Sequence, residues 1–68
     1  MQTMDTWNLA ASLAVEMWMD YGPTKLPAGW RDELVSQGLG EIKPEGQVSL
    51  TALGWKYEER LSRLRRGQ

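Results

Sequence analysis

The chain has 68 residues, of which 41% are hydrophobic and 25% are charged, and its formal net charge is −1. This length predicts one small domain over residues 1–68 and leaves no room for a second. The sequence has no Cys and no His, which excludes disulfide bonds, thiolate or imidazole metal ligands and His-dependent catalytic triads. We therefore expect a protein that is not an enzyme and that holds no cofactor and no metal.

The first predicted element is a helix over about residues 7–21. Asp5 or Thr6 can cap its start, because a short side-chain oxygen accepts hydrogen bonds from the first unpaired amides. Gly22 and Pro23 end it, since Gly tolerates a left-handed conformation and Pro cannot continue the helical hydrogen bonds. Helical spacing places six apolar residues on one side, which is the predicted buried face: Trp7, Ala10, Ala14, Met17, Trp18 and Tyr21.

Apolar residues also border the polar side of this helix. The polar line consists of Asn8, Ser12, Glu16 and Asp20. Leu9, Val15 and Met19 lie beside that line rather than on the predicted buried face. Single exposed apolar residues are normal on a folded protein. A contiguous apolar face would instead indicate a surface that binds another protein chain, and the sequence leaves both interpretations open.

A second helix is predicted over about residues 27–37. Two prolines in the loop before it leave room for at most one turn of structure there. Trp30 and Leu34 lie four residues apart and would face the core. Gly38 supplies a left-handed cap, after which Leu39 is expected to fold back onto Leu34.

A β-hairpin is predicted over about residues 40–50. Ile42 before the turn, and Val48 and Leu50 after it, alternate with polar residues. The turn sequence at residues 43–46 is Lys-Pro-Glu-Gly. It predicts a type I turn followed by a bulge, because Pro presets the second turn position and Gly supplies a positive φ.

Thr51 can cap a last helix over about residues 52–65. Its predicted buried side consists of Leu53, Tyr57, Leu61 and Leu64. Gly54 lowers helix propensity by about 1 kcal/mol relative to Ala, so we expect its backbone to lie close to the second helix or the hairpin. Trp55 points away from the buried line, and it either packs against the first helix or a loop or contributes to a binding interface.

Residues 33–54 resemble the end of a winged-helix domain. In that family a helix closes on a Gly-Leu pair, two strands form the wing, and a Leu-Thr-x-x-Gly motif begins the next helix. Here Gly38 and Leu39 form the pair, and residues 50–54 form the motif. The resemblance covers about residues 27–62. It implies a small winged-helix-like α+β domain with the order helix, helix, hairpin, helix.

The resemblance also implies a way to contact DNA. In winged-helix regulators the helix before the wing is the recognition helix, which would place residues 28–37 at DNA and residues 43–47 beside it. Arg31 and Lys43 would then be candidate nucleic-acid contacts. Only residues 23–26 occupy the place of the helix that normally packs across the recognition helix, so that second helix is shortened or missing.

The charges are divided along the chain. Up to Leu50 there are three cations and seven acids, which gives a net charge of −4. Arg31 is followed by two acids and Lys43 lies between two glutamates, so the elements that would meet phosphate are neutral or acidic. The last helix carries a basic stripe formed by Lys56, Arg60 and Arg63. This stripe is either a solvated helix end or a contact for nucleic acid or an acidic protein surface.

These observations predict a protein-interaction module, inhibitor or adaptor that binds or occludes another protein, either a second copy or a target. The predicted protein contacts are Leu9, Val15, Met19 and Trp55. The alternative is a prokaryotic or phage DNA-binding transcriptional regulator. In size and character the chain is similar to small phage-encoded inhibitors of host proteins. We expect no membrane span and no targeting segment, and the absence of Cys agrees with a cytoplasmic location.

Overall fold

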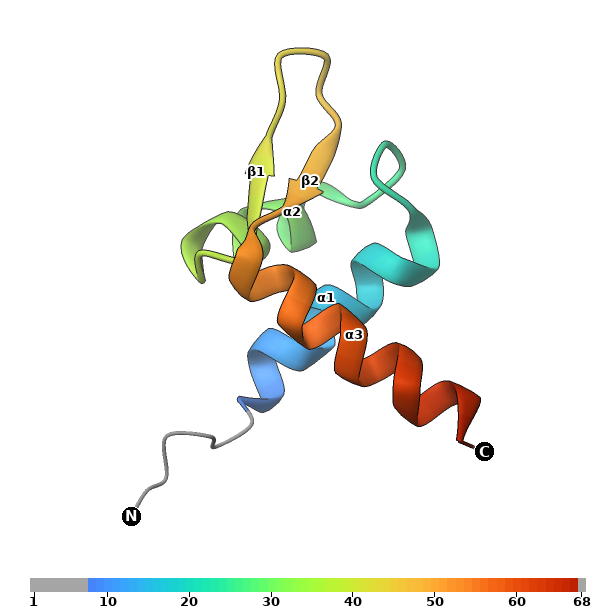
Figure 1. Ribbon diagram of the computed structural model, residues 1–68. Coiled ribbons are helices and arrows are strands. Elements are labelled where there is room, and N and C mark those ends of the chain that lie inside the picture. Colours follow the sequence, from blue (N-terminus) through green and yellow to red (C-terminus); the bar gives the residue numbers. More distant parts are fainter. Residues whose placement is uncertain (1–7, 68) are drawn as a thin grey trace.

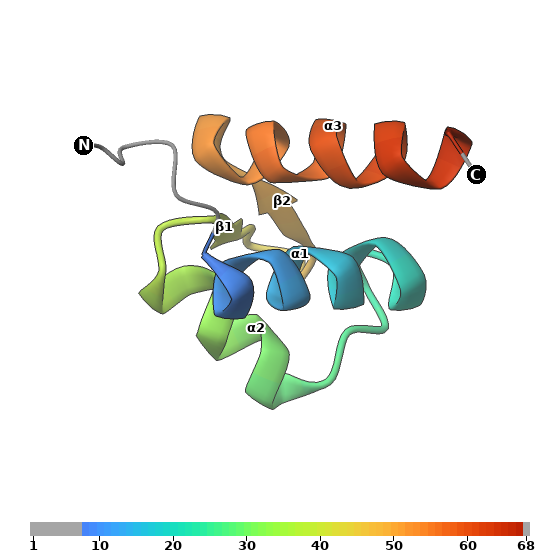
Figure 2. The same ribbon diagram turned by 90° about the horizontal axis from the view of Figure 1, so that it is seen from below.

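The computed structural model describes residues 8–67, which form three helices and a two-stranded antiparallel hairpin. In chain order the elements are α1 (Leu9–Tyr21), α2 (Ala28–Ser36), β1 (Gly40–Ile42), β2 (Val48–Leu50) and α3 (Ala52–Arg66). Helix α1 is the middle layer, with α3 on one side of it and α2 on the other (Figure 2). The hairpin projects from the helices beside the start of α3 (Figure 1). This arrangement confirms the predicted α+β fold class and the predicted order of elements.

Helix α1 begins at Leu9 and is capped by Asn8. The Asn8 side-chain oxygen Oδ1 accepts a hydrogen bond from the Ala11 amide at 3.1 Å, which satisfies one of the amides left unpaired at a helix start. The expected caps, Asp5 and Thr6, lie outside the described residues. Asn8 was predicted to lie on the polar line inside the helix, and it is instead the residue that caps it.

The end of α1 and the loop that follows connect the helix to the hairpin. Gly22 has a φ of 92°, as its predicted role as a cap requires, and its amide donates to the Trp18 carbonyl at 2.9 Å. The Pro23 carbonyl then accepts a hydrogen bond from the Val48 amide at 2.9 Å. Leu26 is buried in the core. The loop therefore covers the outer edge of β2, a contact that the sequence did not reveal.

Helix α2 has the predicted inner residue and the predicted end. The Pro27 carbonyl accepts the first two hydrogen bonds of the helix at 3.0 and 3.1 Å, so Pro27 is the cap and not the first helical residue. At the other end Gly38 has a φ of 72°. Its amide donates to the Val35 carbonyl at 3.0 Å, and the Leu39 amide donates to the Leu34 carbonyl at 2.8 Å. This pair of bonds is the Schellman motif, which confirms the predicted fold-back.

The hairpin has the predicted strands and turn. Its strands pair antiparallel with Gly40 opposite Leu50. The Gly46 amide donates to the Lys43 carbonyl, and the Lys43 amide donates to the Gln47 carbonyl, both at 2.8 Å. Gly46 has a φ of 95°, which is the left-handed conformation that the bulge after a type I turn needs. The register is therefore set by the turn sequence itself.

The start of α3 is fixed by Thr51 and Gly54. The Thr51 hydroxyl accepts a hydrogen bond from the Gly54 amide at 3.2 Å and donates one to the Gly38 carbonyl at 2.6 Å. Gly54 is buried, and a Cβ at this position would collide with the Leu39 carbonyl oxygen. The close approach predicted for Gly54 is thus confirmed, with the segment between α2 and β1 as the neighbour.

The core consists of small and medium aliphatic side chains contributed by α1, β2, α2 and the segments around α2. Its fully buried members are Ala11, Ala14, Val15, Leu26, Leu34, Leu39, Val48 and Leu50. Trp18 and Trp30 are partly buried and pack against this cluster, and Tyr57 and Leu61 do the same from α3. The predicted inward orientation of these four residues is confirmed. Within residues 8–67 no aromatic ring is fully buried, and the core is small, as a chain of this length implies.

Two predictions for α3 were wrong. Leu53 and Leu64, which the spacing placed on the buried side, are 45% and 54% exposed. Helix α3 packs against the rest of the fold along a line through Gly54 and Leu61, which lie two helical turns apart. Gly54 has no side chain, and this lets the α3 backbone lie close to Leu39. Leu53 and Leu64 therefore lie on the flank of the helix.

The double role of Thr51 gives a first prediction. We expect Thr51→Ala to lower the free energy of unfolding by about 1.5 kcal/mol, because it removes both a helix cap and a hydrogen bond to the Gly38 carbonyl. Thr51→Ser keeps both bonds and is expected to lose less than about 0.5 kcal/mol. Urea denaturation followed by circular dichroism measures the difference. Equal losses in the two variants would show that the hydroxyl contributes nothing.

Candidate functional site

The predicted protein contacts on α1 divide into one exposed residue and two that are not. Leu9 is 78% exposed. Val15 is completely buried, and Met19 is partly buried against the core. The prediction for Val15 was therefore wrong, and Met19 offers only part of its side chain. The reason is that α2 and α3 cover α1 from two sides, so Val15 and Met19 face the interior.

Three large apolar residues are exposed on the part of α1 that α2 and α3 leave uncovered, together with Ala10 and Asp20. Leu13 is 41% exposed and follows Leu9 by four residues, and Tyr21 is 52% exposed and follows Leu13 by eight. Tyr21 was predicted to be buried, and Ser12, from the predicted polar line, is buried instead. We call Leu9, Leu13 and Tyr21 the α1 face. Of these three residues, Leu9 was predicted as a protein contact and Tyr21 as a buried residue, and Leu13 was assigned to neither group.

Trp55 combines the two roles that the sequence left open. Its ring packs against that of Trp18 in an edge-to-face arrangement, with centroids 5.8 Å apart and planes at 80°. The Trp18 indole N–H donates to the Val48 carbonyl at 2.8 Å, which fixes the ring that Trp55 contacts. Trp55 itself is 49% exposed. Half of this indole is therefore held in place by α1, and the other half is open to a partner.

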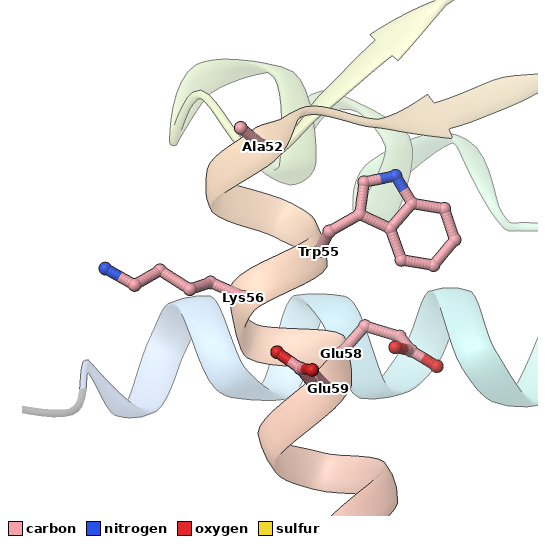
Figure 3. Close-up of a pocket in the computed structure, with 5 residues that line it drawn as sticks. All are labelled: Ala52, Trp55, Lys56, Glu58 and Glu59. Atoms are coloured by element: carbon pink, nitrogen blue, oxygen red, sulfur yellow. The ribbon is translucent and has the colours of Figure 1, made fainter.

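A shallow hollow borders Trp55 on the outer side of α3 (Figure 3). It is lined by Ala52, Trp55, Lys56, Glu58 and Glu59. All five residues come from one helix, and in Figure 3 the side chains of Trp55 and Lys56 point in opposite directions. The hollow has no opposing wall and no converging polar groups, which a small-molecule site would need.

Arg31 and Lys43, the candidate nucleic-acid contacts on α2 and the hairpin, are engaged within the fold. The Arg31 guanidinium donates from Nη2 to the Gly46 carbonyl at 2.8 Å, and so ties α2 to the hairpin turn. The Lys43 ammonium lies 3.6 Å from the Glu41 carboxylate. Both cations thus have local partners, and neither is arranged as a free positive group beside the turn.

The cations of α3 differ in whether they form ion pairs with α1. The Arg65 guanidinium reaches α1, where it lies 3.0 Å from the Asp20 carboxylate and 3.4 Å from that of Glu16. The hydrogen bond to Asp20 raises the pKa of Arg65 above its ordinary value. A raised pKa in the folded state means that this stabilisation is present in full at neutral pH and is lost as the pH rises through that pKa. The sequence did not point to this cross-helix pair.

The predicted basic stripe of α3 is on the surface. Lys56, Arg60 and Arg63 are all exposed. Within residues 8–67 no carboxylate forms an ion pair with Lys56 or Arg63. Lys56 and Arg63 of the stripe, together with the α1 face, are therefore surface features that contacts within the described chain leave unexplained.

Two other kinds of function would require a metal-binding cluster or a helix that spans a membrane. Across residues 8–67 no cluster of three or more acidic, Cys or His side chains could hold a metal ion. None of the helices in that range combines the length and the apolar content needed to cross a bilayer. Comparisons with known proteins give no match, whether to a protein-family model, to a curated protein or to a solved structure.

Proposed function

We propose that this protein is a small interaction module that acts by binding or occluding another protein chain. The observation that carries the proposal is the α1 face. Leu9, Leu13 and Tyr21 are large apolar residues that stay exposed on a helix that α2 and α3 already cover from two sides. Large apolar side chains that repeat along one helix face are a usual means of binding a partner.

The half-exposed Trp55 adds support to this function. Its contact with Trp18 holds the indole in one orientation before binding, and an ordered aromatic ring loses little entropy when a partner covers it. Trp is also the residue type most enriched among side chains that dominate interface energies. The module therefore offers an aliphatic surface on α1 and one aromatic anchor on α3.

We further propose a winged-helix-like frame for this module. The order of α2, hairpin and α3 supports it, as do the Schellman end of α2 and the hydrogen bond between the Pro23 carbonyl and the edge of β2. A frame of this kind does not require DNA binding, because function lies in the surface and not in the fold. Arg31 and Lys43 are engaged locally, which favours a protein partner over a duplex.

The experiment compares two double variants that change the net charge equally. Leu9→Glu/Leu13→Glu places two carboxylates on the α1 face, and circular dichroism checks that the variant is folded. Thr24→Glu/Gln47→Glu places two at exposed positions outside α1. We expect capture of a specific protein from the source organism, or self-association in sedimentation equilibrium, to fall at least about tenfold only in the α1 variant.

Two outcomes would contradict the proposal. One is equal capture and equal solution mass for the wild type and both variants, with all three folded by circular dichroism. The other is salt-dependent retention of the intact protein on duplex DNA that the α1 variant leaves unchanged. The second outcome would establish the DNA-binding alternative, which the order of helix and hairpin and the basic stripe of α3 favour.

A further inference from the structure

The solvent side of α3 combines cations with exposed leucines. Leu53, Arg60 and Leu64 lie seven and four residues apart, and therefore follow one line along the helix. Lys56 and Arg63 lie seven residues apart and follow the neighbouring line. All five residues are exposed. We call them the α3 face.

The α3 face carries more cations than acids, since it holds Lys56, Arg60 and Arg63 with Glu59 beside them. Arg65, on the inner side of α3, is the cation that neutralises Glu16 and Asp20 of α1. On the outer side, Lys56 and Arg63 form no ion pair with any carboxylate in the described part of the chain. Two cations are thus left exposed at a fixed spacing of about 10 Å along the helix axis.

We propose that the α3 face binds an acidic amphipathic helix of a partner protein. This inference rests on the proposed function and assigns the chemistry of one partner segment. Carboxylates along one edge of such a helix would meet Lys56, Arg60 and Arg63, and its apolar side would cover Leu53 and Leu64. With 15 residues, α3 extends for about 22 Å and offers four turns for this contact.

The leucines distinguish this partner from a nucleic acid. Phosphate groups would pair with the cations but would leave Leu53 and Leu64 exposed to water, whereas an amphipathic helix removes their apolar surface from water as well. The face also includes a neighbouring carboxylate, since Glu59 lies one helical turn from Arg63.

The test uses a defined probe, a fluorescein-labelled synthetic helix of about 18 residues with Leu at helical spacing on one side and Glu beside it. Fluorescence anisotropy measures its affinity for the full chain. We expect Lys56→Glu/Arg63→Glu to weaken binding at least about tenfold and Leu53→Gln to weaken it about threefold. The matched variant Lys25→Glu/Lys43→Glu changes the net charge equally but lies outside α3, and we expect its affinity to stay within about twofold of the wild type.

A second peptide of the same composition, with Leu and Glu shuffled so that no apolar side exists, is expected not to bind. Equal binding of the two peptides, or no binding of the amphipathic one, would overturn the inference. So would a duplex of about 20 base pairs that binds more tightly than the peptide and is unaffected by Leu53→Gln. Failure of the proposed function is a separate result, because the α1 variant tests partner capture and is expected to bind the peptide normally.

Discussion

Gly54→Ala is expected to lower the free energy of unfolding by about 3 kcal/mol, although Ala is the better helix former by about 1 kcal/mol. The new methyl group would collide with the Leu39 carbonyl oxygen and lie 3.1 Å from the Leu50 Cβ. The Leu39 oxygen cannot move away cheaply, since it accepts the Thr51 amide at 2.9 Å. The steric cost falls on backbone atoms, so it exceeds the gain in helix propensity.

Gly29→Ala is the matched control for this prediction. Gly29 also lies in a helix, but a Cβ there would meet no atom within 4 Å. We expect this variant to be more stable than the wild type by about 0.5 kcal/mol, because Ala restricts the unfolded chain and favours the helix. Urea denaturation of both variants gives the two free energies. If the substitutions shift stability in the same direction, α3 does not depend on the absence of a side chain at Gly54.

Leu34→Ala is the second substitution with a large expected effect, a loss of about 3 kcal/mol. The Leu34 side chain is completely buried. It packs closely against Gly40, because a Cβ added to Gly40 would lie only 3.3 Å from the Leu34 Cβ. Its carbonyl accepts the Leu39 amide in the motif that turns α2 into the hairpin. A cavity at this point therefore loosens the contact between α2 and β1. In a domain of this length such a loss is a large part of the total stability.

Val35→Ala is the control within the same turn of α2. Val35 is 45% exposed, so truncation removes little buried area, and the better helix propensity of Ala offsets part of that loss. We expect a change of less than about 0.5 kcal/mol. Denaturation curves that give similar midpoints for the two variants would contradict the assignment of Leu34 to the centre of the core.

The local elements of this fold follow from short-range chemistry, which is why the sequence predicted them. Gly38 takes a left-handed conformation that ends α2, and Gly46 does the same in the hairpin turn. Thr51 caps α3 through its own side chain. Each of these features depends on residues within four or five positions along the chain, and their conformational preferences act without help from the rest of the molecule. Gly54 belongs with them in part, because its poor helix propensity signalled a close neighbour.

The candidate site was less predictable, because α1 has apolar residues on nearly every side. Spacing alone identified the helix but could not select which face is buried, and Val15 and Tyr21 were consequently assigned to the wrong environments. In the folded chain α2 and α3 both pack on α1, so two of its sides are covered, and Leu9, Leu13 and Tyr21 are the large apolar residues of α1 that remain exposed.

The sequence by itself determined where helices and strands begin and end, how the hairpin turns and where the charges are divided. Only the tertiary structure decided which apolar and basic side chains are left for a partner. Arg31 and Arg65 show the physical reason most directly, because their long side chains reach Gly46 and Asp20, which are 15 and 45 residues away along the chain. Contacts over such separations depend on how the elements pack, and local preferences do not encode that packing.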